Sequence, residues 1–184
     1  CILLFSVFLI KINVCLCYRL GGNMDGLWEK ISSYNLFNNL FPGALFIYLL
    51  ERSTSVVLST EDIVKNIVLY YFVGLVIGRV GSIVVEPILK AVRVIRFTPY
   101  SDYISACKKD SKIEMLQEVA NMYRTLLTMS ILLLAALLCI EALTNNDYNL
   151  SKWVSSFFTV VFIASYIKQI NYIVARVIKA NKLP

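Results

Sequence analysis

Residues 125–143 read TLLTMSILLLAALLCIEAL, a stretch in which Glu141 is the sole charged residue. About 20 apolar residues in an α-helix cross the hydrocarbon core of a bilayer. The stretch therefore predicts a membrane-spanning helix from Thr125 to Leu143. It is the clearest of several apolar blocks along the chain, and such a series is the pattern of a polytopic membrane protein.

The composition of the whole chain agrees with this interpretation. Apolar residues make up 58% of the 184 residues and charged residues 16%, whereas soluble domains average about 45–50% and about 25%. A chain of this length with several apolar blocks forms one helical bundle and leaves no room for a separate soluble domain. The net charge of +6 is interpreted as an excess of Lys and Arg on the cytoplasmic side of a membrane protein. It is not taken as a sign of nucleic-acid binding.

Three further blocks complete a predicted four-helix membrane domain over residues 24–184. Residues 62–86 follow Thr60, and we expect Glu61 and Asp62 in the first helical turn. Residues 153–173 begin at Trp153, a residue type that anchors helices at the membrane interface. Residues 40–58 are the least regular span, with Pro42 expected in its first turn. The predicted fold class is all-α.

The N-terminal part has two interpretations. Gly21-Gly22 just before Met24 is compatible with a translated ribosome-binding sequence, so that residues 1–23 are upstream DNA and Met24 is the natural start. In the alternative, residues 1–23 are an extra apolar segment. After Met24, the spacing of apolar residues predicts a short helix lying in the interface.

Residues 87–124 are the one long polar stretch. Thr98-Pro99 is expected to end the helix arriving from the membrane, and Ser101 to cap a helix through Lys108. Asp110 or Ser111 caps the next helix, which can continue through residues 112–143 as a rod of about 48 Å. These elements form a predicted cytoplasmic helical hairpin between the second and third spans.

Basic residues predict the orientation. They concentrate between residues 90 and 124 and near the C-terminus, and cytoplasmic segments carry the excess of Lys and Arg. Both termini and residues 87–124 are therefore expected in the cytoplasm of a bacterial inner-membrane protein.

Small residues interrupt the second span at Gly74, Gly78, Gly81 and Ser82. Three of these recur every four residues and share one helix face, where another backbone can approach closely. The pattern favours helix packing, either within one subunit or in a homo-oligomer.

Four charged residues lie at the cytoplasmic end of the predicted spans: Arg79, Glu86, Arg124 and Lys168. In one interpretation the basic side chains reach outward to the headgroups. In the other they line an inward-facing cationic vestibule, in which Arg79 pairs partly with Glu86, seven residues later on the same helix face.

The polar stretch also carries candidate residues for docking a cytoplasmic protein. Acidic and basic side chains alternate there, unlike in nucleic-acid patches, so no nucleic-acid partner is expected. The candidates are Tyr100, Asp102, Tyr103, Lys108, Lys109, Glu114 and Glu118.

No enzymatic motif is found in the chain. Histidine is absent, and the five cysteines form no C-x-x-C pair, so neither a metal site nor a cofactor is predicted. The leading functional hypothesis is a non-enzymatic membrane protein that oligomerises and couples to a cytoplasmic partner through residues 97–124, as an anchor, sensor or effector. The alternative is an ion channel or transporter with the cationic vestibule.

Overall fold

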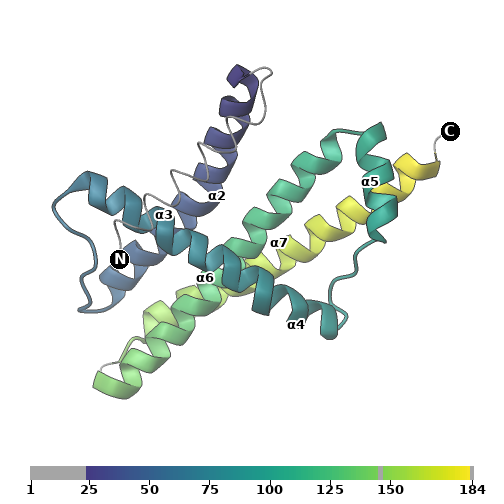
Figure 1. The fold of residues 1–184 in the computed structure, drawn as a ribbon. Helices are drawn as coiled ribbons and strands as arrows, with labels where there is room; N and C mark the ends of the chain where they lie inside the picture. Colours follow the sequence, from purple (N-terminus) through teal and green to yellow (C-terminus); the bar gives the residue numbers. More distant parts are fainter. Residues whose placement is uncertain (1–23, 145–146, 183–184) are drawn as a thin grey trace. The chain divides into compact units, whose positions relative to one another are not determined.

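A computed structural model describes residues 24–144 and 147–182, with side chains from Asn38 onward. Within these residues the fold is all-helical and contains no strand, as predicted (Figure 1). The contacts described below lie within residues 36–184, which form one compact unit. The elements are α2 (Met24–Ser53), α3 (Ile63–Val80), the π-helix η1 (Gly81–Val85), α4 (Glu86–Ala91), α5 (Tyr100–Lys109), α6 (Lys112–Thr144) and α7 (Asn149–Lys182).

Three helices are long and apolar enough to cross a membrane. They are the continuous helix Ile63–Ala91, α6 and α7. Helices α6 and α7 contain the predicted spans 125–143 and 153–173, and the first helix contains the predicted span 62–86 except its first residue, Asp62. A membrane location is compatible with this finding. The span over residues 40–58, and with it the count of four, stays a prediction, and the interpretation of residues 1–23 lies outside the described residues.

Helices α6 and α7 form an antiparallel pair that lies side by side along most of its length (Figure 1). Small polar residues allow close contact in the part of the pair that includes the first turns of α7, where the buried Ser155 hydroxyl donates to the Ser130 carbonyl oxygen at 2.9 Å. Near the turn that joins the helices, Lys152 Nζ lies 2.7 Å from Glu141 Oε2. Large apolar side chains of both helices form a core with residues of η1, α4 and α5, and Leu126 and Met129 of α6 pack against Ile77 of α3.

Helix α2 differs from the prediction at two places. Pro42 lies inside one helix rather than in the first turn of a new one, which membrane helices tolerate because neighbouring groups satisfy the freed carbonyl. The helix ends at Ser53, so it does not extend to Leu58. Residues 54–60 instead fold back onto the Glu51 carboxylate, which accepts the backbone N–H groups of Leu58 and Ser59 at 2.7 and 2.6 Å.

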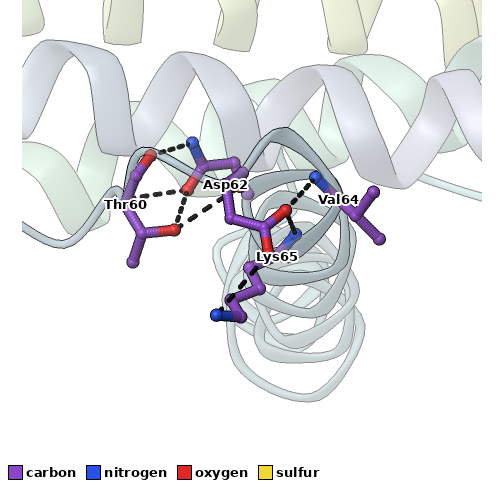
Figure 2. A network of polar contacts seen from close by, with 5 residues as sticks. Thr60, Asp62, Val64 and Lys65 are labelled. Atoms are coloured by element: carbon purple, nitrogen blue, oxygen red, sulfur yellow. Dashed lines mark hydrogen bonds and ion pairs between the residues drawn. The ribbon is translucent and has the colours of Figure 1, made fainter.

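The start of α3 also corrects the prediction that Glu61 and Asp62 lie in the first turn. Asp62 is the N-cap residue, and its carboxylate accepts the backbone N–H groups of Val64 and Lys65 (Figure 2). Thr60 lies before the helix and exchanges hydrogen bonds with the Asn66 amide. Capping of two otherwise unpaired N–H groups sets the first helical residue at Ile63.

Between the spans, α5 begins at Tyr100, two residues earlier than a cap at Ser101 predicts. Pro99 is its N-cap, and no side chain caps it, so the prediction that Ser101 caps this helix is wrong. Proline presets the backbone angle of the entry without needing a side-chain cap. At the following helix start, the Asp110 carboxylate accepts the Lys112 N–H at 3.1 Å, which selects Asp110 over Ser111. Helix α6 then runs unbroken to Thr144, including the predicted rod.

Candidate functional site

The densest polar cluster within the apolar helices centres on Glu86 at the start of α4. Its carboxylate forms an ion pair with Arg124 of α6, and its other oxygen lies 2.7 Å from Lys90 Nζ. The Glu86 and Arg124 side chains are 17% and 16% exposed, whereas that of Lys90 is 48% exposed. The Lys90 ammonium also stands 4.5 Å from the ring centroid of Phe97. One carboxylate thus holds two cations from two helices.

The π-helix explains why Glu86 faces Arg124. In a regular α-helix, residues seven apart differ by about 20° in direction, since each residue turns about 100°. Here the Glu86 N–H donates to the Gly81 carbonyl, five residues back, and such a bulge inserts one extra residue into the turn. Glu86 is therefore rotated by about 100° from its direction in a regular α-helix and lies about 120° from Arg79. The predicted partial pairing of Arg79 with Glu86 is wrong, because Glu86 pairs with Arg124 and Lys90.

The contact between the π-helix and α6 depends on the small size of Gly81. A Cβ at this position would lie 2.6 Å from Thr128 Oγ1 and 3.5 Å from Arg124 Cγ. The absence of a side chain lets the π turn approach α6 and brings Glu86 within reach of Arg124. Tyr166 of α7 is buried against Arg124 on the inner side, while Arg124 Nε is buried without an acceptor among the described residues.

An open cavity of about 390 Å³ adjoins this cluster. It is formed by residues of α4, the segment before α5, the start of α5, and α6 and α7. Its lining combines charged, aromatic and aliphatic side chains, including Glu86, Lys90, Phe97, Tyr103, Gln117 and Ile173. Its walls can accommodate an amphipathic group, but both charged residues are already paired with each other.

Helix α5 is fastened to the C-terminal half of α7 by polar contacts. Arg176 Nε donates to Asp110 Oδ2 at 2.7 Å, and the Asn181 amide donates to the Asp102 carbonyl at 2.8 Å. The hydrogen bond from Arg176 holds the pKa of the Asp110 carboxyl below its usual value, against a smaller opposing effect of desolvation. Gln169 of α7 also donates to the Leu116 carbonyl of α6 at 3.1 Å. These contacts hold α5 and the start of α6 against the C-terminal half of α7, so this part of the fold is ordered by interactions within the chain.

The Asp110–Arg176 pair lies in a second open cavity, of about 740 Å³. Its lining comes from the end of α5 and the last turns of α7, and includes Tyr172 and Lys179. The Asp110 carboxylate and the Arg176 guanidinium neutralise each other within this lining.

Neighbouring helices approach the small residues of the predicted glycine face to different distances. A Cβ on Gly74 would overlap the Asn39 carbonyl of α2, and a Cβ on Gly43 would overlap the Tyr70 carbonyl of α3. At Gly78 the nearest atom, Thr125 Oγ1, would be 3.6 Å away, which is ordinary contact. Ser82 donates to the Gly78 carbonyl within its own helix. The tight approach therefore occurs at Gly74 and Gly81.

The structure separates the three cations of the predicted vestibule. Arg79 and Lys168 are exposed, and neither forms an ion pair within the described residues. Arg124 is half-buried and bound to Glu86. None of the three lines either cavity described above. The exposure of Arg79 and Lys168 is compatible with side chains that reach the headgroups.

Most of the predicted docking residues lie on the surface. Tyr103 is the exception: it packs partly buried against the core, and burial raises its pKa to about 12. Lys109 lines the second cavity. The residues that are exposed are Tyr100, Asp102, Lys108, Lys109, Glu114 and Glu118.

Sequence reasoning missed several members of these clusters. Lys90 had a recognisable signal, because it stands four residues after Glu86 on one helix. Gly43 also had one, since it follows Pro42 in an apolar segment. The pairing of Asp110 with Arg176 joins residues 66 positions apart, and no local pattern indicates it.

Among the described residues, no group of three or more His, Cys, Asp and Glu side chains is placed to hold a metal ion. Cys107 and Cys139 are free thiols. Comparison with protein-family models, with curated proteins and with solved structures finds no match for this chain.

Proposed function

We propose that the protein is a non-enzymatic integral membrane component that presents a preformed helical surface to a cytoplasmic protein partner. The observation that carries the proposal is the exposure of large side chains on α5 and on the start of α6, before its apolar stretch. Tyr100 is 78% exposed, Met115 49% and Ile104 36%. Protein interfaces are enriched in such aromatic residues and methionine, with charged residues at the rim.

The surrounding charges fit a protein partner. Exposed acidic and basic residues of α5 and α6 lie among these apolar side chains, and they include Asp102, Lys108, Glu114 and Glu118. The contacts from α7 hold α5 in place before any partner binds. A preformed surface lowers the entropy lost on association.

Site-specific photo-crosslinking in native cells tests the proposal. A benzoylphenylalanine at Met115 is expected to give one discrete protein adduct, whereas the same group at Phe157, which is 64% exposed on the apolar part of α7, gives none. Lys108→Glu should remove the adduct while membrane level and detergent stability stay unchanged. Lipid adducts alone at both positions would contradict the proposal, and ion flux through reconstituted liposomes would favour the channel alternative.

The proposal places both termini and residues 87–124 in the cytoplasm of a bacterial inner membrane. Cys107 is half-buried, so Ser105→Cys, on the exposed side of α5, is the better probe in a cysteine-free background. An impermeant maleimide added to intact cells should leave it unmodified and should label Ser55→Cys in the exposed loop after α2. The reverse labelling pattern would invert the orientation.

Self-association is also proposed, through the lipid-facing sides of the helices. The apolar face of α3 is exposed at Val64, Val68 and Phe72, and this face can contact either lipid or another copy of the chain. Mass measurement in detergent decides: a particle containing one copy at micromolar concentration would remove this part of the proposal.

A further inference from the structure

Residues 90–97, KAVRVIRF, form the turn by which the chain leaves the helix Ile63–Ala91, and they are called the basic turn below. The basic turn carries three cations, Lys90, Arg93 and Arg96. No acidic residue occurs between Pro87 and Ser101. This one-sided charge contrasts with the mixture of acids and bases on α5 and the start of α6.

Apolar side chains of the basic turn are exposed between its cations. Val92 is 63% exposed, Val94 40% and Phe97 38%, whereas Ile95 is 2% exposed and anchors the turn in the core. Lys90 is engaged by Glu86 and by the Phe97 ring. Arg93 and Arg96 are exposed, and neither forms an ion pair with the described residues. Two arginines are thus available for an external anion.

The backbone at Arg93 adopts a conformation that ordinarily favours glycine. Its φ is 58°, in the left-handed region. The Val94 N–H donates to the Leu89 carbonyl and the Arg93 N–H to the Lys90 carbonyl, both at 3.0 Å. These two bonds are those of a helix end at which glycine usually occupies the left-handed position. The chain has arginine there despite the steric cost.

The location and chemistry of the basic turn favour one class of ligand. The turn directly follows an apolar helix that can cross the membrane, so it lies where hydrocarbon gives way to headgroups. A soluble anion would satisfy the arginines but leave the valines and Phe97 in water. A bilayer surface provides phosphate oxygens and an apolar boundary together.

We propose that the basic turn is a binding surface for acidic phospholipids, whose headgroups contact Arg93 and Arg96 while Val92, Val94 and Phe97 enter the acyl boundary. The arginine fork can bind phosphate at two points. Arg93 in the left-handed conformation places this fork at the very end of the membrane helix.

Tryptophan quenching by brominated lipids tests the proposal. The reporter is Phe97→Trp in the full chain carrying Trp28→Phe and Trp153→Phe, reconstituted in phosphatidylcholine vesicles. Quenching by brominated phosphatidylglycerol should exceed that by brominated phosphatidylcholine, with a relative binding constant of about 25, from about fivefold for each arginine. Arg93→Gln with Arg96→Gln should reduce the ratio to about 1, while the control Lys108→Gln with Lys112→Gln should retain it.

Arg93→Gly separates lipid binding from folding. Glycine relieves the left-handed backbone, so the folded-to-unfolded ratio in sodium dodecyl sulfate titrations should rise about threefold. The acidic-lipid ratio should nevertheless fall about fivefold. A rise in the folded-to-unfolded ratio together with a fall in the acidic-lipid ratio supports the proposal. Equal quenching by the two lipids in the parent reporter, an equal loss in the lysine control, or abolition of the preference by millimolar glycerol 3-phosphate would overturn it.

Discussion

Helix α6 and the helix Ile63–Ala91 are both long and apolar. They differ in backbone hydrogen bonding, and this decides the direction in which their side chains point. Helix α6 continues for 33 residues with one hydrogen-bonding pattern. The other helix changes to a π-helix at Gly81–Val85 before it continues as α4. Counting residues therefore assigns faces correctly along α6 and fails across the π turn, where Glu86 moves to the side of Arg124.

The difference has a functional consequence. An unbroken α3–α4 helix would direct Glu86 toward the same side as Arg79, and Arg124 would be half-buried without a carboxylate. Leaving a buried charge unpaired is costly. The extra residue in the π turn supplies the partner, and Gly81 supplies the space for it.

The largest effect is expected from Gly74→Ala. Its Cβ would overlap the Asn39 carbonyl, a backbone atom that cannot move without moving α2, and the expected loss of unfolding free energy is about 3 kcal/mol. Gly78→Ala is the matched control on the same face, because its Cβ would meet nothing closer than 3.6 Å. Unfolding in mixed micelles measures both. Equal stability of the two variants would show that the glycine face acts as a whole rather than at single positions.

A smaller effect is expected from Glu86→Gln, which leaves the Arg124 guanidinium without its carboxylate. Breaking a fully buried pair costs about 3–5 kcal/mol, and partial exposure of this pair reduces the expected loss to about 2 kcal/mol. Arg79→Gln, seven residues earlier, should match the parent. A double-mutant cycle of Glu86→Gln with Arg124→Gln measures the coupling. The π-turn explanation fails if Arg79→Gln couples to Glu86→Gln more strongly than Arg124→Gln does.

The smallest effect concerns the attachment of α5 and depends on pH. The folded pKa of Asp110 is lowered by Arg176, while an unfolded Asp titrates near about 3.9. The pair thus stabilises the attachment fully above the unfolded pKa, and the contribution is lost as the pH falls through the folded pKa. Intact-protein hydrogen exchange corrected for intrinsic rates should show faster opening of α5 below about pH 4.

Asp110→Asn is expected to abolish this pH dependence, so that α5 opens fast at every pH. Asp102→Asn, on α5 but without an ion pair among the described residues, is the control and should keep it. Identical pH profiles for Asp110→Asn and the parent would show that the pair does not hold α5.

Several features could be predicted from local residues. The apolar stretch from Thr125 to Leu143 lies in one long helix. Asp110 was one of two predicted caps and is the one observed. Each of these depends on residues within a few positions of one another. The end of α2 could not be predicted in this way, because Glu51 stops the helix by binding a loop that folds back on it. Pro99 stands at the start of α5, but the helix arriving from the membrane already ends at Ala91, so the prediction that Thr98-Pro99 ends it is wrong.

The sequence alone determined that the chain consists of apolar helices around one polar segment, because hydrophobic length and backbone capping are local properties. Only the tertiary structure decided that Gly74 meets Asn39, that Glu86 pairs with Arg124 and that Asp110 pairs with Arg176. The two ion pairs join residues 38 and 66 positions apart. Their formation depends on the direction in which each side chain points and on how closely the helices pack. One inserted residue at the π turn changes the direction of Glu86.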